Sequence, residues 1–108
     1  LDLLSELRDQ GSRIYALIGD RTFSSGVLNA QDLRDMGATL VGEPTGGVRG
    51  FGELTTVELG EGYVLSCSTK DFSGGKEHRP VEPDRRVEQT VEDLLAGVDS
   101  AVSYVQGL

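Results

Sequence analysis

The chain has 108 residues, of which 18 are acidic and 10 basic, and its net charge is −8 at pH 7. That length suffices for one domain, residues 1–108, with a single modest core, and the negative charge argues against nucleic acid as a partner. No apolar run approaches the roughly 20 residues of a membrane-spanning helix, and one cysteine with one histidine excludes a structural zinc site, so we expect no metal and no cofactor.

The first third of the chain predicts a helix and then a strand–helix–strand unit. Three leucines within residues 3–7 form one face of a short helix, which Gly11 ends. Residues 13–19 are a continuous apolar run of strand length, typical of a strand covered on both faces. Apolar residues recur with helical spacing over 24–36, and residues 39–41 form a second buried strand. This order predicts a parallel βαβ crossover and an α/β fold class.

The stretch RTFSSG, residues 21–26, joins the first strand to the helix and places two serines at the helix N-terminus. Unpaired N–H groups and the positive end of the helix dipole favour negative charge there, which is the environment that a serine nucleophile and its oxyanion need. Serine is also a frequent N-cap. Taken locally, Ser24 and Ser25 therefore fit either a catalytic role or a capping role.

A Gly-rich loop, EPTGGVRG at residues 43–50, follows the second strand. Its spacing matches neither a P-loop nor a dinucleotide-binding fingerprint, so we expect an active-site or surface loop. Two strands near 53–59 and 63–69 predict a hairpin, with an exposed loop over 70–83 after it.

The chain becomes helical again from Thr90. Gly97 and Asp99 interrupt the apolar spacing and predict a break or a cap.

Four side chains outside the serine turn belong to residue types that take part in catalysis. Cys67, which follows Leu65 and Ser66 in a strand-like segment, is expected to be a small buried residue. His78 has charged neighbours and is expected to be a solvated loop histidine. Lys70, next to Asp71, is expected to stay charged. Glu82 either orients a catalytic partner or belongs to an ordinary proline turn before the last helix.

Several motifs occur together in one order. They are TFSSG at 22–26, LVGEPTGG at 40–47, GE at 52–53, SCSTKDF at 66–72, VEPD at 81–84 and EDLLAGVD at 92–99. In this order and spacing they resemble the C-terminal processing (tail-specific) serine peptidases, in the branch of the tricorn core proteases and the interphotoreceptor retinoid-binding repeats. The resemblance covers nearly the whole chain. It implies a crotonase-like or ClpP-like superhelix of ββα units, of which this chain would be the C-terminal half of the catalytic domain.

The resemblance also implies roles for individual residues. Ser24 would be the nucleophile, and the N–H of Ser25 would form half of the oxyanion hole. Gly46 and Gly47 would take part in substrate binding, and Glu82 would be a catalytic glutamate. The lysine that serves as base in the processing branch is absent from this chain, so the base would come from an upstream histidine.

These roles lead to two alternative functions. The first is peptide-bond hydrolysis by acyl transfer through Ser24, with a peptide or an unfolded protein as the substrate and no activity for this chain by itself. The second is a non-catalytic module that binds a peptide or an apolar ligand. Sheet edges left exposed by an incomplete domain would favour a homo-oligomer. The resemblance to the family, and nothing else in the sequence, implies an exported protein.

Overall fold

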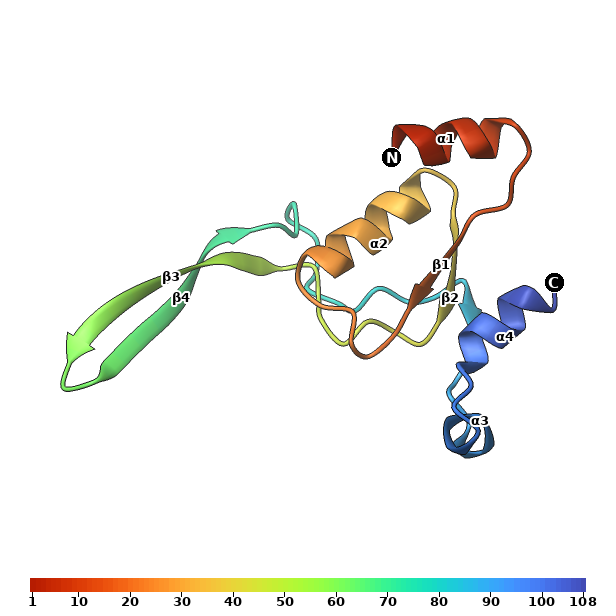
Figure 1. The fold of residues 1–108 in the computed structure, drawn as a ribbon. Coiled ribbons are helices and arrows are strands. Elements are labelled where there is room, and N and C mark those ends of the chain that lie inside the picture. The colour runs from red at the N-terminus through yellow and green to blue at the C-terminus, as the bar shows by residue number, and fades with distance from the viewer.

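The computed structural model describes residues 1–108 as a mixed α/β structure with a small parallel sheet and a separate antiparallel hairpin (Figure 1). The parallel sheet has the strand order β1-β2-β5, and the hairpin is formed by β3 and β4. The elements are α1 (Asp2–Asp9), β1 (Tyr15–Ile18), α2 (Ser25–Asp35), β2 (Thr39–Gly42), β3 (Phe51–Gly60), β4 (Tyr63–Asp71), β5 (Arg85–Arg86), α3 (Val91–Leu95) and α4 (Ser100–Gln106).

The predicted strand–helix–strand unit is confirmed. β1 and β2 pair in parallel, with Tyr15 opposite Thr39 and Ile18 opposite Gly42, and α2 connects them. The helix ends where expected, because Gly37 adopts a φ of 100° and its N–H donates to the carbonyl of Arg34 at 2.8 Å.

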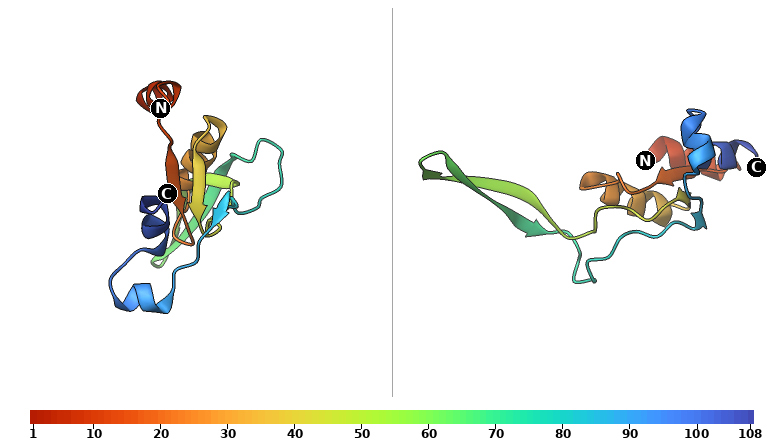
Figure 2. Two further views of the ribbon diagram at one scale, coloured as in Figure 1. Left: turned by 90° about the vertical axis from the view of Figure 1, so that its right-hand side faces the viewer. Right: turned by 90° about the horizontal axis from the view of Figure 1, so that it is seen from below.

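The core is small and lies between the parallel sheet and α2. Ile18, Val27, Ala30, Leu40 and Val81 form one buried cluster, and only 12 of the 108 residues are buried in all. α2 and α4 pack on the sheet from opposite sides (Figure 2), but α4 has only seven residues.

The prediction that the first strand is covered on both faces is therefore wrong. Leu17, which points away from α2 because strand residues alternate, remains 46% exposed.

The predicted hairpin is confirmed and is longer at both ends than expected. Glu61 and Gly62 form its turn with φ values of 51° and 82°, as in the type I′ turns that suit the twist of paired strands. The hairpin extends away from the sheet and the helices (Figures 1 and 2). Cys67 lies on this arm and is exposed, so the prediction of a buried cysteine is wrong.

The segment before the last helices is a strand rather than a simple proline turn. The N–H of Asp84 donates to the carbonyl of Leu40 at 2.8 Å, and the Asp84 carboxylate accepts from the N–H of Leu40 at 2.7 Å. β5 follows directly and pairs in parallel with β2, with Val41 opposite Arg85. The side chain of Asp84 thus completes the edge of β2 where the third strand joins.

The predicted break in the C-terminal helical region is confirmed. Gly97 has a φ of 71° between α3 and α4, and the Asp99 carboxylate caps α4 by accepting from the N–H groups of Ala101 and Val102. Thr90 caps α3 in the same way. None of the helices combines the length and apolarity needed to cross a bilayer.

Candidate active site

Ser24 has an unusual backbone conformation at the point where the chain passes from β1 into α2. Its φ is 52° and its ψ is −126°, a region that residues with a Cβ rarely adopt. The preceding turn is closed by Thr22, whose hydroxyl accepts from the N–H of Gly19 at 3.1 Å and whose N–H donates to the carbonyl of Gly19 at 2.9 Å. The sequence therefore builds a tight strand-to-helix turn with an exposed serine at its end.

The side chain of Ser24 does not cap the helix. Ser24 occupies the N-cap position of α2, yet its hydroxyl accepts no hydrogen bond from the first turn. The N–H groups of Gly26 and Val27 donate instead to the carbonyls of Phe23 and Ser24, at 2.9 and 3.0 Å. The first turn leaves the N–H of Ser25 without an acceptor, so this donor remains available beside the Ser24 hydroxyl.

Ser24 and Ser25 line a small cavity of about 170 Å³. Three non-glycine residues in the chain have a positive φ, and two of them, Ser24 and Glu53, line this cavity. The Glu53 carboxylate pairs with Lys70 at 2.6 Å. The other lining residues come from α2, from the Gly-rich loop, from the start of β3 and from the end of the hairpin: Leu28, Val48, Arg49, Gly50, Phe51, Gly52 and Phe72.

No histidine or lysine lines the cavity, and its one carboxylate, that of Glu53, is paired with Lys70. Arg49, Phe51 and Phe72 were not predicted as site residues. A loop arginine and two phenylalanines carry no sequence signal of their own, and only the fold brings them beside Ser24.

Gly46 and Gly47 lie against the Ser24 turn rather than in the cavity. Their N–H groups donate to the carbonyls of Gly19 and Thr22, at 3.2 and 3.0 Å. A Cβ on Gly46 would come within 1.8 Å of the Asp20 carbonyl oxygen, so this approach requires a glycine. The structure thus places both glycines as supports of the turn, and it shows no surface of either in the cavity.

Glu82 is not among the residues that line the Ser24 cavity. Its carbonyl accepts a hydrogen bond from Arg34 of α2. Its exposed side chain lines a different cavity.

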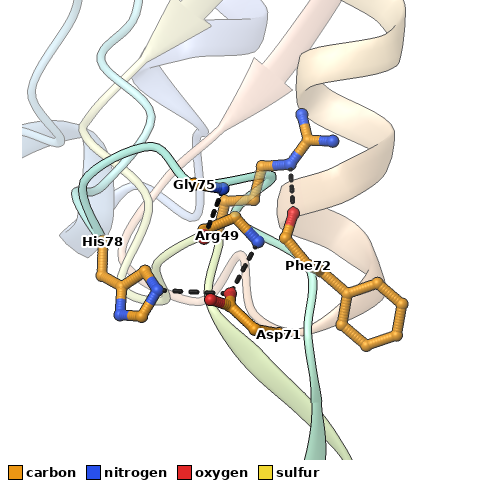
Figure 3. Close-up of polar contacts among 6 residues, drawn as sticks. Arg49, Asp71, Phe72, Gly75 and His78 are labelled. Atoms are coloured by element: carbon orange, nitrogen blue, oxygen red, sulfur yellow. Dashed lines mark hydrogen bonds and ion pairs between the residues drawn. The ribbon is translucent and has the colours of Figure 1, made fainter.

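His78 is an exposed loop histidine, as predicted, and it contacts two neighbouring side chains. Its Nε2 lies 3.3 Å from Asp71 Oδ1 (Figure 3). Its ring packs edge-on against Phe51 with the centroids 4.8 Å apart. The backbone N–H and hydroxyl of Ser73, and then His78, lower the pKa of the Asp71 carboxyl from its ordinary value of 3.8. His78 is not among the residues that line the Ser24 cavity.

A larger cavity of about 660 Å³ was not predicted. It opens at the carboxyl ends of β1 and β2, which is where parallel α/β sheets often bind ligands. Leu17, Asp20 and Glu43 line it from the sheet side, and Val98 and Ala101 from the region of α4.

Neither a protein-family model nor a curated protein matches the chain. What the chain does is therefore inferred from the geometry around Ser24, together with the resemblance of its motifs.

Proposed function

We propose that this chain supplies the nucleophile of a serine peptidase. The observation that carries the proposal is the backbone of Ser24, held at a positive φ in a tight strand-to-helix turn while its hydroxyl is left uncapped. Such strain persists only where the surrounding structure enforces it, and it is concentrated at functional sites. A strained turn between a strand and a helix is also how other serine hydrolases expose their nucleophile.

The reaction would be acyl transfer. A general base removes the proton of the Ser24 hydroxyl as Oγ bonds to the peptide carbonyl carbon, and the N–H of Ser25 stabilises the resulting oxyanion. The C–N bond then breaks, the proton passes to the leaving amine, and the acyl group remains on Oγ as an ester. Water, deprotonated by the same base, hydrolyses this ester and restores the serine.

The general base would come from outside these 108 residues. No histidine or lysine lines the Ser24 cavity, and the resemblance assigns the base to an upstream histidine. In this proposal the chain is the C-terminal half of a crotonase-like or ClpP-like catalytic domain, and by itself it is inactive because a serine without a base is a weak nucleophile.

A non-catalytic binding module is the second candidate. Two observations favour it: the Ser24 cavity has no histidine or lysine and its Glu53 carboxylate is paired with Lys70, and the cavity of about 660 Å³ beside α4 has the size of a small-molecule site. On this alternative the same scaffold holds a peptide or an apolar ligand without cleaving it.

Labelling with a fluorophosphonate distinguishes the two functions. We expect the protein in its complete natural length to gain the mass of one adduct, and its Ser24→Ala variant to gain none. Ser25→Ala is the matched control and should still be labelled, because its backbone N–H survives the substitution.

A folded complete protein that takes up no adduct would contradict the peptidase proposal and favour the binding module. Labelling lost in Ser25→Ala but kept in Ser24→Ala would mean that Ser25 is the nucleophile.

A further inference from the structure

Basic side chains gather around a third cavity, of about 290 Å³, next to the Ser24 cavity. It is lined by Arg34, Arg49, Lys76 and Arg79, against the two carboxylates of Glu77 and Glu82. Four of the ten basic residues of the chain thus lie around one small space, although the chain as a whole has a charge of −8.

Part of this positive charge has no carboxylate partner within the chain. Arg79 pairs with Glu77 at 2.5 Å, and Arg34 pairs with Asp84 at 3.3 Å. Neither Arg49 nor Lys76 forms an ion pair.

The cavity also has unused hydrogen-bond donors. The Nε of Arg49 donates to the Phe72 carbonyl at 2.7 Å, which holds the guanidinium away from the Asp71–His78 pair (Figure 3). The terminal guanidinium nitrogens of Arg49 and the Nζ of Lys76 donate to no acceptor in the chain. Donors and charge are therefore both available for an anion.

This basic cavity is adjacent to the candidate active site. Arg49 lines both cavities. Along α2, Leu28 lines the Ser24 cavity and Gln31 and Arg34 line the basic one; these residues are three apart and so form a row on the helix. Gln31 and Arg34 are seven and ten residues after Ser24, or about 10–15 Å along the axis.

We infer that the basic cavity is a subsite for an acidic side chain of the peptide that occupies the Ser24 cavity. An extended peptide advances about 3.3–3.6 Å per residue, so the acidic residue would lie about three or four positions from the peptide bond at Ser24. Arginines suit this role because the guanidinium binds a carboxylate through two parallel hydrogen bonds. The inference rests on the proposed function only in taking a peptide as the ligand, since binding requires no cleavage.

The test measures the binding of two matched peptides by fluorescence anisotropy. Both are fluorescein-labelled, nine residues long and amidated at the C-terminus, and they differ only in carrying two Glu or two Gln near one end. The protein is used in its complete natural length with Ser24→Ala, which prevents cleavage. We expect the Glu peptide to bind at least about tenfold more tightly than the Gln peptide, as one or two charge-assisted hydrogen bonds provide.

Lys76→Gln is the decisive variant, because Lys76 is exposed and its side chain has no partner to lose. It should weaken binding of the Glu peptide several-fold and leave binding of the Gln peptide unchanged. Arg13→Gln is the matched control: it removes the same charge from an exposed residue outside the cavity and should change neither affinity.

Equal binding of the two peptides would overturn the subsite, and so would an equal loss of affinity in Arg13→Gln, which would indicate a general charge effect. These outcomes are independent of the labelling of Ser24. Selective binding of the Glu peptide in a protein that takes up no fluorophosphonate would support the subsite on a non-catalytic scaffold.

Discussion

At the scale of single residues, the backbone conformation of Ser24 lowers the stability of the folded chain. Glu61 also has a positive φ, but the hairpin turn requires it. No hairpin turn explains the φ of 52° at Ser24. Asparagine or glycine would adopt this φ at a lower cost in free energy. A serine kept in this conformation without a capping bond supports the proposal that its hydroxyl is the nucleophile.

This account predicts opposite effects for two small substitutions. Ser24→Gly should raise the free energy of unfolding by about 1 kcal/mol, because glycine relieves the strained φ at some cost in chain entropy. Ser24→Ala should change it by less than about 0.5 kcal/mol, since no capping bond is lost. Urea unfolding followed by circular dichroism measures both.

A decrease of about 1 kcal/mol in the free energy of unfolding of Ser24→Ala is what removal of an N-cap costs. This result would show that the Ser24 hydroxyl caps the helix, and it would weaken the case for a nucleophile.

At the scale of elements, the loop that supports Ser24 depends on one buried hydroxyl. Thr45 is 2% exposed; its Oγ1 accepts from the N–H of Val81 at 2.8 Å and donates to the carbonyl of Gly47 at 2.7 Å. Its N–H donates to the Val81 carbonyl at 3.1 Å. Thr45 thus ties the loop that holds the Ser24 turn to the segment leading into β5.

Thr45→Val should therefore destabilise the protein by about 1–3 kcal/mol, because it leaves the buried N–H of Val81 without an acceptor while keeping the shape of the side chain. Thr45→Ser is the control and should cost about 1 kcal/mol at most, since it keeps the hydroxyl and loses one methyl group. Urea unfolding of the two variants measures the difference. Equal losses would show that packing rather than hydrogen bonding holds the loop.

Local patterns predicted most of the elements. Spacing of apolar residues placed β1, α2 and β2, and glycines marked the end of α2 and the break before α4, because these signals act within a few residues. β5 was missed because its two residues, Arg85 and Arg86, are polar and are a strand only through pairing with β2. The buried cysteine was wrongly predicted because a strand pattern does not show whether anything covers the strand.

The candidate site was predictable only in part. A serine in a strand-to-helix turn is visible in the sequence, but its φ is not. Arg49 and Lys76 are 27 positions apart and come to one cavity only through the loops on either side of the hairpin. Long-range placement of this kind depends on the tertiary fold, which local patterns do not encode.

At the scale of the whole molecule, the chain exposes more surface than a compact protein does. Its accessible surface is 7680 Å², whereas a compact monomer of the same mass exposes about 5,800 Å². Its radius of gyration is 17.4 Å, against about 13 Å for a compact domain of this length. The excess is about 1,900 Å² on one chain and about 3,800 Å² on two, and the latter is within the total area that obligate interfaces bury.

We therefore expect the isolated chain to self-associate, in part through one face of the hairpin. Val57 and Leu65 are directly opposite each other on that face and are about half exposed. Replacing both with Lys should shift the chain toward the monomer in sedimentation velocity at matched concentrations, because charge on an exposed strand opposes edge and face pairing.

Thr56 and Ser66 form the neighbouring pair on the opposite face and provide the control. Lys at both of these positions adds the same charge and should leave association largely unchanged. An equal shift for the two double variants would mean that added charge, rather than the apolar face, controls association.

The hairpin also affects the order in which the chain folds. Val41 and Arg85 must meet for β5 to join the sheet, and they are 44 positions apart, with the whole hairpin between them. The hairpin has local contacts only, so it can form early and bring Phe51 next to Asp71. The loop that remains to be closed is then about half as long, which lowers its entropic cost by about 0.6 kcal/mol. An arm that adds nothing to the core would in this way speed the final step of its assembly.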